Sequence, residues 1–233
     1  MWFLLNRTVS WNEWMRGPEI EPSIYAADFA SLGRDMTTLL DGGAKIFQFD
    51  VGDGHFVEPI TIGPIVSQAI APIFRAKGGI LDVHLMVDNP EHHFEMFRKA
   101  GADHVTFHHE VVDDPAPLVA RARELGLCVG IAFNPETEPE EVAATAGDVD
   151  LVLCMGVHPG YSGQAFMPET TDRVRRLREL LPDEIHIQVD GGVGMESVRE
   201  LREAGADLFV AGSSLFAQED EVAAYRELSA AVQ

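Results

Sequence analysis

Eight short apolar segments alternate along the chain with segments whose apolar residues recur at helical spacing. Each strand–helix pair occupies roughly 25 residues, a repeat length typical of β-α units. Because the expected strands are apolar along nearly their whole length, they belong in a parallel sheet that is buried on both faces. Eight such units favour a single closed (β/α)8 TIM barrel of class α/β. An open, doubly wound sheet is the alternative, but no GxGxxG motif follows the first strand.

The expected elements follow in strict alternation. Several of the expected helices begin near a proline and end at a glycine, as at Pro90 and Gly101. The expected strands span residues 22–27, 45–51, 80–87, 104–109, 127–133, 151–157, 185–190 and 208–212. The expected helices span residues 30–43, 64–76, 90–102, 114–126, 137–147, 168–181, 194–206 and 219–232. This order predicts a barrel catalytic domain over residues 21–233, preceded by an N-terminal extension of residues 1–20.

The extension contains all three tryptophans, Trp2, Trp11 and Trp14. It lacks the basic start of a signal peptide. Because it is rich in tryptophan, we expect it to pack against the bottom of the barrel or at a subunit contact. A misassigned start codon is the alternative. The two cysteines, Cys128 and Cys154, lie in apolar runs without a CxxC spacing, which favours a reducing, cytoplasmic location.

The chain is strongly acidic, with 38 acidic against 17 basic residues and a net charge of −21. This balance excludes a nucleic-acid binder that works through a general basic surface, and it disfavours docking on anionic membranes. A small anionic substrate is still compatible with it, provided that backbone N–H groups or a metal ion hold the anion.

Polar residues cluster where the expected strands end, and barrel active sites are built at the carboxyl ends of the strands. Burial of such groups is unfavourable unless they are paired or bind a metal ion. The convergence of two aspartates and a histidine therefore predicts a functional site. In chain order, these residues are Ser23, Asp50 with Asp53 and His55, His84 with Met86, His108 with His109, Asn134, Met155 with His158, Asp190, and Ser213.

A set of distinctive motifs follows the order of the expected strands: PSIYAADFASLG, DVGDGHFVEPITIGP, DVHLMVDNPE, AFNPET, MGVHPGYSGQAFMPE, VDGGV and AGADLFVAGSSLF. In content and order, this set resembles the ribulose-phosphate 3-epimerase family. The resemblance extends from Pro22 to Phe216. It implies a barrel that binds one divalent metal ion (zinc, manganese, iron or cobalt) and interconverts D-ribulose 5-phosphate and D-xylulose 5-phosphate.

The same resemblance implies roles for individual residues. Asp50 and Asp190 match the pair that moves a proton at carbon 3, a reaction that requires one ionised and one protonated group. Asp50, His84 and Asp190 match metal ligands. Ser23, His84, Met86 and Met155 match residues at the substrate, although core packing is an equal alternative for the methionines. The phosphate is expected at Gly160, Tyr161, Ser162, Gly163, Gly191, Gly192, Gly212 and Ser213, where glycines allow backbone N–H groups to approach an anion.

Two positions depart from the family pattern H-x-D-V-M-D-G, because this chain has QFDVGDG. Gln48 replaces a metal-binding histidine, and an amide oxygen is a weaker zinc ligand than imidazole. The site could therefore use only three ligands, prefer a harder ion such as manganese or magnesium, or bind none. His55 lies too far along the turn for a simple substitute. Gly52 replaces a methionine, which predicts open space beside the reacting carbon.

Three functions remain open from the sequence. The first is the pentulose-phosphate epimerase, and the second is an epimerase of another ketose phosphate, such as a hexulose 6-phosphate. The third is a silent sugar-phosphate-binding paralogue, against which the intact Asp50 and Asp190 argue. The D-x-K-x-x-D array of orotidine-phosphate decarboxylase relatives is absent. The expected partner is a small sugar phosphate, without nucleic acid or membrane, and the resemblance implies a homo-oligomer.

Overall fold

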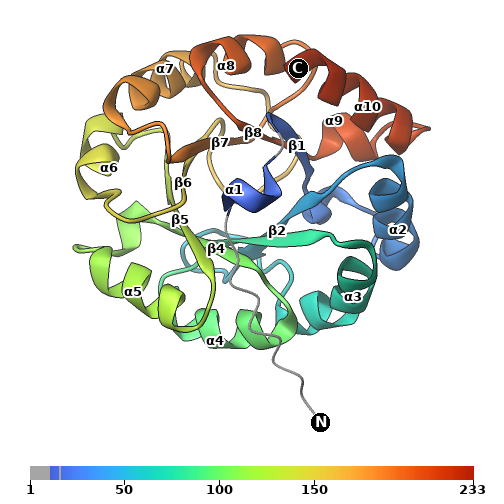
Figure 1. The fold of residues 1–233 in the computed structure, drawn as a ribbon, viewed down its shortest axis with the longest axis horizontal. Coiled ribbons are helices and arrows are strands. Elements are labelled where there is room, and N and C mark those ends of the chain that lie inside the picture. The colour runs from blue at the N-terminus through green and yellow to red at the C-terminus, as the bar shows by residue number, and fades with distance from the viewer. Residues whose placement is uncertain (1–10, 16) are drawn as a thin grey trace.

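The computed structural model describes residues 11–15 and 17–233, and Figure 1 views it along the axis of an eight-stranded parallel barrel ringed by helices. The sheet order is β1-β8-β7-β6-β5-β4-β3-β2, as expected when each strand is followed by a helix that returns the chain to the same end. The predicted (β/α)8 TIM barrel is confirmed.

The strands and helices lie close to the predicted segments. The strands are β1 Glu19–Pro22, β2 Ile46–Gly52, β3 Ile80–Met86, β4 His104–His108, β5 Cys128–Phe133, β6 Leu151–Met155, β7 His186–Asp190 and β8 Leu208–Ala211. The α-helices are α1 Trp11–Trp14, α2 Leu32–Gly42, α3 Pro64–Lys77, α4 Glu91–Ala100, α5 Ala116–Glu124, α6 Pro139–Thr145, α7 Thr170–Leu180, α8 Val198–Ala204, α9 Ser213–Phe216 and α10 Glu221–Val232. Two short 3-10 helices, η1 Ile24–Ala26 and η2 His109–Val111, follow β1 and β4.

The helices α1 and α9 have no counterpart among the predicted helices, and the first strand is misplaced. Its predicted range of 22–27 is wrong, because β1 ends at Pro22 and the chain then enters η1. Pairing with β8 runs from Glu19 opposite Leu208 to Pro22 opposite Ala211. The segment EIEP contains two glutamates and so does not read as an apolar run, although Glu21 is fully buried.

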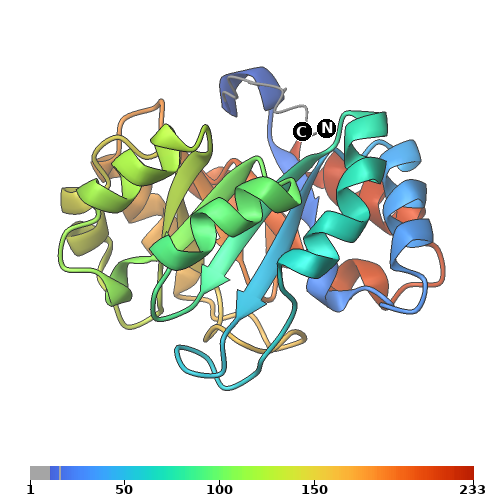
Figure 2. The same ribbon diagram turned by 90° about the horizontal axis from the view of Figure 1, so that it is seen from below.

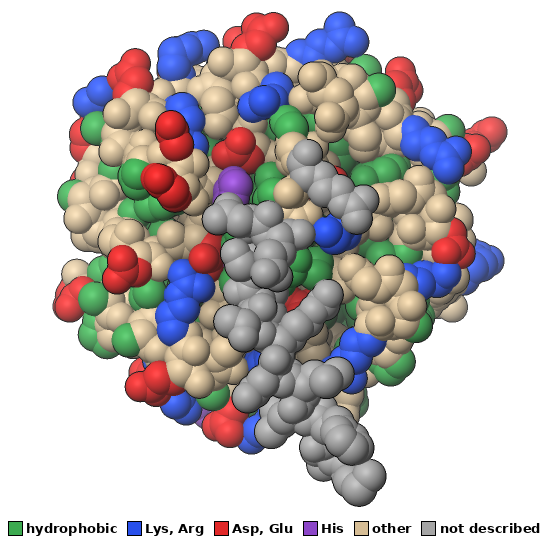
Figure 3. Space-filling view, in the orientation of Figure 1, with side chains coloured by type: hydrophobic (Ala, Val, Ile, Leu, Met, Phe, Trp, Pro, Cys, Tyr) green, Lys and Arg blue, Asp and Glu red, His purple; other side chains and the backbone are tan. Residues whose placement is uncertain are grey.

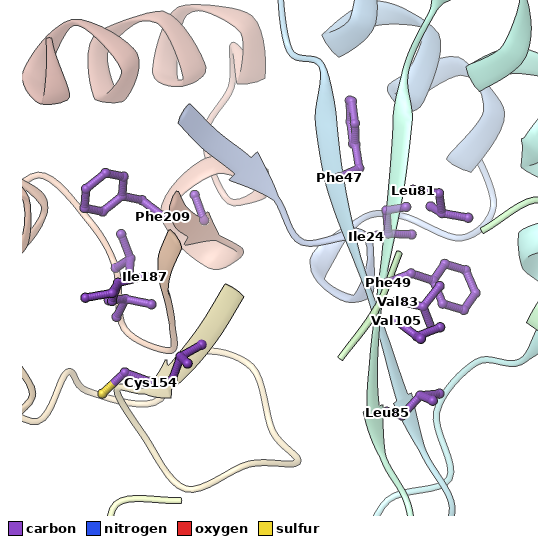
Figure 4. Packing of buried hydrophobic residues seen from close by; sticks show 14 of the residues in the cluster. Ile24, Phe47, Phe49, Leu81, Val83, Leu85, Val105, Cys154, Ile187 and Phe209 are labelled. Carbon is purple, nitrogen blue, oxygen red and sulfur yellow. The ribbon is translucent and has the colours of Figure 1, made fainter. Parts of the chain in front are cut away.

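The main apolar core lies between the outer face of the barrel and the helices. Alternate strand residues point outward into it, as Figure 4 shows for Phe47, Phe49 and their neighbours. The ring of Phe47 meets Phe74 of α3 edge-on with centroids 5.0 Å apart, and Phe49 meets Phe97 of α4 at 5.9 Å. Such pairs fix each helix against its strand and so hold the strand ends in place.

The inside of the barrel contains a layer of buried polar side chains. Gln188 Nε2 donates to Glu21 Oε2 over 2.9 Å and to Asp82 Oδ2 over 2.8 Å. On the other side of Asp82, its Oδ1 lies 2.6 Å from His104 Nδ1. Burial and the nearby charge of Asp82 raise the pKa of Glu21 well above its usual value. Hydrogen bonding within this layer replaces part of the lost hydration of its members, while Glu21 Oε1, Gln188 Oε1 and His104 Nε2 have no hydrogen-bond partner among the described residues.

Helix α1 covers the amino-terminal end of the barrel. Trp11 and Trp14 are buried there against the first residues of several strands, including Ile46 and Ile80. The ring of Trp11 meets His104 edge-on with centroids 5.0 Å apart. Trp11 and Trp14 therefore pack at the barrel bottom, one of the two predicted placements, whereas Trp2 lies outside the described residues. Figure 3 shows this face, with acidic and basic side chains scattered around its rim.

The carboxyl ends of the strands lie at the opposite end from α1, where Figure 2 shows the arrowheads leading into long loops. The barrel closes between β1 and β2 through an isolated parallel bridge between Ser23 and Gln48. Among the described residues, no helix is both long and apolar enough to cross a membrane.

Candidate active site

A cavity of about 860 Å³ opens at the carboxyl end of the barrel. Side chains and loops that follow several different strands line it, as expected for the functional end of such a barrel. The sequence-predicted residues that line it are Ser23, Asp50, Met86, Met155, His158, Gly160, Tyr161, Ser162, Gly163, Asp190, Gly191, Gly192, Gly212 and Ser213. Gln48 and His84 are fully buried and reach the cavity through their contacts with the two aspartates.

Asp50 of β2 and Asp190 of β7 share one hydrogen-bond donor at the base of the cavity. Gln48 Nε2 lies 2.7 Å from Asp50 Oδ1 and 2.8 Å from Asp190 Oδ2. Ser23 Oγ donates to the other oxygen of Asp50 over 2.7 Å. The sequence therefore brings together two carboxylates from separate strands and supports each with neutral donors.

His84 of β3 lies beside the same pair. Its Nδ1 is 3.1 Å from Asp50 Oδ1 and 3.6 Å from Asp190 Oδ2. Burial lowers the pKa of His84, but hydrogen bonding to Asp190 and Asp50 outweighs burial and raises the pKa to about 9. These two distances show that Nδ1 is the nitrogen of this ring that faces the carboxylates.

The two aspartates differ in how their surroundings treat a negative charge. Burial raises the pKa of Asp50, but hydrogen bonds from His84, Ser23 and Gln48 outweigh it and hold the pKa below the usual value. For Asp190, burial and the neighbouring charge of Asp50 together raise the pKa. A pair of carboxyls with pKa values pushed apart can hold one ionised and one protonated member, which is what acid–base chemistry at one carbon needs.

A second polar chain, which the sequence did not predict, continues from His84. His84 Nε2 lies 2.8 Å from His108 Nε2, and His108 Nδ1 lies 3.2 Å from Glu110 Oε2. Glu110 Oε1 accepts from the backbone N–H of Asn134 and the hydroxyl of Thr137. His108 was among the predicted strand-end residues, but its contact with Glu110 could not be read from the sequence.

The loop after β2 accounts for the remaining residues of the DVGDGHF segment. Asp53 Oδ1 accepts from the N–H groups of His55 and Phe56, and Asp53 Oδ2 accepts from Asp88 N–H over 2.9 Å. Asp53 therefore holds the loop rather than a ligand. His55 is exposed and does not line the cavity, in agreement with its predicted distance from the site.

Gly52 does not open space, and that prediction is wrong. A Cβ atom at this position would lie 2.7 Å from Pro59 O and 2.8 Å from Val57 Cγ2. The loop 53–62 folds back over the strand end, where Gly52 N–H donates to Thr61 Oγ1 over 2.7 Å. Thr61 Oγ1 in turn donates to Asp50 O over 2.8 Å. The glycine thus permits close approach of backbone and loop.

Glycine-rich turns form the other side of the cavity. Gly191 and Gly192 adopt φ values of 108° and 67°, a region that favours glycine. A Cβ on Gly192 would lie 2.5 Å from Phe166 Cα, so the two loops touch directly. Among the described residues no Lys or Arg lines the cavity, and Glu196 and Glu200 do. An anion bound here would therefore depend on backbone N–H groups.

The donor set at the base of the cavity fits a divalent metal ion. Ligand atoms of Asp50, His84 and Asp190 all lie within 4.8 Å of one another. Two carboxylates and one imidazole suit zinc, iron or manganese. Gln48 Oε1 is buried and has no hydrogen-bond partner among the described residues. A half-turn of this amide would exchange its two polar atoms and direct the oxygen at the carboxylates, where a cation would bind it.

Comparison with known proteins gives one consistent result. The model of the "Ribulose-phosphate 3 epimerase family" matches residues 19–216. The chain is 40% identical to a ribulose-phosphate 3-epimerase from Serratia marcescens over 206 residues, 86% of this chain and 96% of that protein. It is 37% identical to the corresponding protein from Bacillus subtilis over 214 residues, 90% of this chain and 97% of that protein.

Solved structures agree with the fold. A structure of 3-hexulose-6-phosphate synthase superposes with a TM-score of 0.69 at 18% identity, covering 92% of this chain and all (100%) of the other. A likeness at this identity supports the barrel architecture alone.

Proposed function

Because the chain belongs to the ribulose-phosphate 3-epimerase family, and is therefore a carbohydrate epimerase of the isomerase class, we propose that it interconverts D-ribulose 5-phosphate and D-xylulose 5-phosphate by proton transfer between Asp50 and Asp190 at carbon 3. The observation that carries this proposal is the aspartate pair itself, whose two carboxyls meet at one amide and have pKa values shifted in opposite directions.

In the proposed mechanism Asp50 is the ionised member and removes the carbon-3 proton from one face of the sugar. Ser23 and Gln48 hold its carboxylate by hydrogen bonds. Asp190 is the protonated member and returns a proton to the opposite face, which inverts the centre. In the reverse direction the two residues exchange these roles. The buried methionines Met86 and Met155 line the cavity and would keep water from the intermediate.

A divalent cation would be held by Asp50, His84 and Asp190, with Gln48 as a further oxygen donor after rotation of its amide. When bound, it supplies Lewis-acid stabilisation of the negative charge that develops on the substrate oxygens. The phosphate group would bind the backbone N–H groups of the turns at 160–163, 191–192 and 212–213.

The space beside Gly52 is filled, so it gives no support to the alternative of a longer sugar. The decisive experiment is proton NMR of D-ribulose 5-phosphate in D₂O with purified protein, first with added Mn²⁺ and then with chelator. Deuterium at carbon 3 together with xylulose 5-phosphate establishes the proposed reaction. Exchange without the second sugar would remove one member of the pair from its role, and no exchange in either state would refute the proposal for this substrate.

A further inference from the structure

The chain Glu110–His108–His84 extends the site away from the cavity into the wall of the barrel. The side chains of His84 and His108 are at most 1% exposed, and their rings meet edge to edge at Nε2, with centroids 5.0 Å apart and planes inclined by 25°. Glu110, in η2 just beyond β4, has a side chain that is 22% exposed. None of the proposed chemical steps uses His108 or Glu110, so their arrangement requires a separate explanation.

Glu110 is held as a hydrogen-bond acceptor. Its Oε1 accepts from Asn134 N–H over 2.7 Å and from Thr137 Oγ1 over 2.5 Å. Burial raises the pKa of this carboxyl, but hydrogen bonds from His108, Thr137 and Asn134 outweigh it and lower the pKa to about 2. A carboxylate can only accept, so the nitrogen that faces Oε2, His108 Nδ1, must carry a proton.

The proton on His108 Nδ1 fixes the next contact. A neutral imidazole has one N–H and one lone pair, so His108 Nε2 is left as an acceptor. His84 Nε2 lies only 2.8 Å away, and two N–H groups cannot point at each other over that distance. His84 must therefore place a proton on Nε2. In its neutral form the lone pair is then on Nδ1, the nitrogen that faces Asp50 and Asp190.

We infer that His108 and Glu110 are positioning residues that select the tautomer of His84, so that its Nδ1 presents a lone pair to a cation held between Asp50 and Asp190. This inference rests on the cation site of the proposed function, and it adds which residues set the proton position on His84 before a cation binds. A hydrogen-bonded partner behind a metal-binding imidazole orients the ring and fixes its tautomer. Here a second imidazole stands between the carboxylate and that ring.

The substitution Glu110→Gln tests the inference with almost no change of shape. The Gln amide has one oxygen and one NH₂ group, and the N–H of Asn134 requires the oxygen. The NH₂ group then faces His108 Nδ1, which must become the acceptor. The proton of His108 moves to Nε2, His84 Nε2 becomes the acceptor, and Nδ1 of His84 carries the proton. The lone pair no longer faces the aspartates.

The first readout is ¹⁵N–¹H NMR of the histidine rings in the chelator-treated protein. We expect His108 of the wild type to be protonated at Nδ1 and His108 of E110Q to be protonated at Nε2. The exposed residue Glu138, one position beyond Thr137, supplies the matched control E138Q, which should leave the wild-type pattern unchanged. A wild-type His108 protonated at Nε2 would overturn the inference without any variant, so the test does not depend on E110Q folding.

The second readout is the affinity for Mn²⁺ alone, measured from the EPR signal of the free ion. Loss of such a supporting contact should weaken binding about 10–100-fold in E110Q and leave E138Q unchanged. If the His108 tautomer is reversed in E110Q but the Mn²⁺ affinity is unchanged, His108 and Glu110 have no role in cation binding. If the wild type bound no Mn²⁺, the cation site of the proposed function would fail instead, while the tautomer of His108 would still show whether Glu110 sets the proton positions.

Discussion

Gln48 and Asp190 are 142 positions apart in the chain, yet Gln48 Nε2 donates to Asp190 Oδ2 across 2.8 Å. The same nitrogen lies 2.7 Å from Asp50 Oδ1, so one neutral amide spans both carboxylates. In the absence of a cation this contact reduces the repulsion between them. Gln48, one of the two residues that depart from the family pattern, thus joins the two aspartates of the site.

Gln48→His should tighten zinc binding. The side chain at this position reaches both carboxylates, and imidazole is a better zinc ligand than an amide oxygen. We expect the zinc dissociation constant to fall by about tenfold or more, 1.4 kcal/mol for each factor of ten. Competition with a chromogenic chelator measures it. Gln68→His on the exposed face of α3 is the matched control and should change nothing. Equal zinc affinity in both variants would place residue 48 outside the metal's reach.

Asp190→Asn should abolish epimerisation and keep the fold. The amide cannot transfer the proton, and loss of one acid–base group lowers the rate by about 10²–10⁴-fold. Its oxygen can still accept from Gln48, which preserves the local packing. Because Asp50 remains, we expect slow deuterium exchange at carbon 3 of one sugar without formation of the other, as followed by NMR. Circular dichroism would check the fold. Substantial turnover in the variant would remove Asp190 from the reaction.

Glu21→Gln should stabilise the protein at high pH. Burial raises the pKa of Glu21 in the folded state above its unfolded value. Its contribution to stability is therefore full below the unfolded pKa and is lost as the pH rises through the folded pKa. A glutamine keeps the acceptor for Gln188 and has no charge to bury. We expect a higher Tm at pH 8, about 2–4 °C for each kcal/mol gained, and a smaller difference at pH 5.

The control for that experiment is Glu203→Gln, an exposed residue of α8 that is not among the charges that act on Glu21. Thermal unfolding at both pH values, monitored by circular dichroism, gives the comparison. An equal Tm change at pH 5 and pH 8 in Glu21→Gln would show that ionisation of Glu21 does not contribute to the effect.

Gly52→Ala should destabilise the fold. The added methyl group would meet Pro59 O at 2.7 Å and Val57 Cγ2 at 2.8 Å, and backbone must move to admit it. Overpacking of this kind costs about 1–3 kcal/mol. Gly63→Ala is the matched control, because a Cβ there meets nothing within 4 Å. Urea denaturation would measure both variants. A Gly52→Ala variant as stable as Gly63→Ala would show that loop 53–62 yields without loss.

The order of the elements could be read from the sequence because buried parallel strands leave a direct signature, a continuous apolar run. The signature fails where a strand carries its own polar residues inward. Glu21 made β1 look unlike a strand, and the prediction moved to the residues after it. The strand ends Asp50, His84 and Asp190 could be predicted as one site, because a barrel brings all strand ends to one mouth.

Contacts within the barrel could not be predicted in the same way. The layer of Glu21, Asp82 and Gln188 joins three strands whose registers only the folded barrel sets. Glu110 is close to His108 in sequence, but its contacts depend on the turn of η2 and on Asn134, which directly follows β5. The space beside Gly52 likewise depends on where the following loop folds, which the sequence does not show.

The bridge between Ser23 and Gln48 gives the barrel a seam. The other neighbouring strands in the described chain are joined by ladders of several residues, whereas β1 and β2 meet at this bridge. Ser23 is hydrogen-bonded to Asp50, and Gln48 spans Asp50 and Asp190. The junction with the fewest backbone hydrogen bonds is therefore tied together by the side chains of the site itself. If β1 and β2 move apart at this junction, Ser23 separates from Asp50. Closure of the barrel and the arrangement of the aspartates therefore depend on the same few hydrogen bonds.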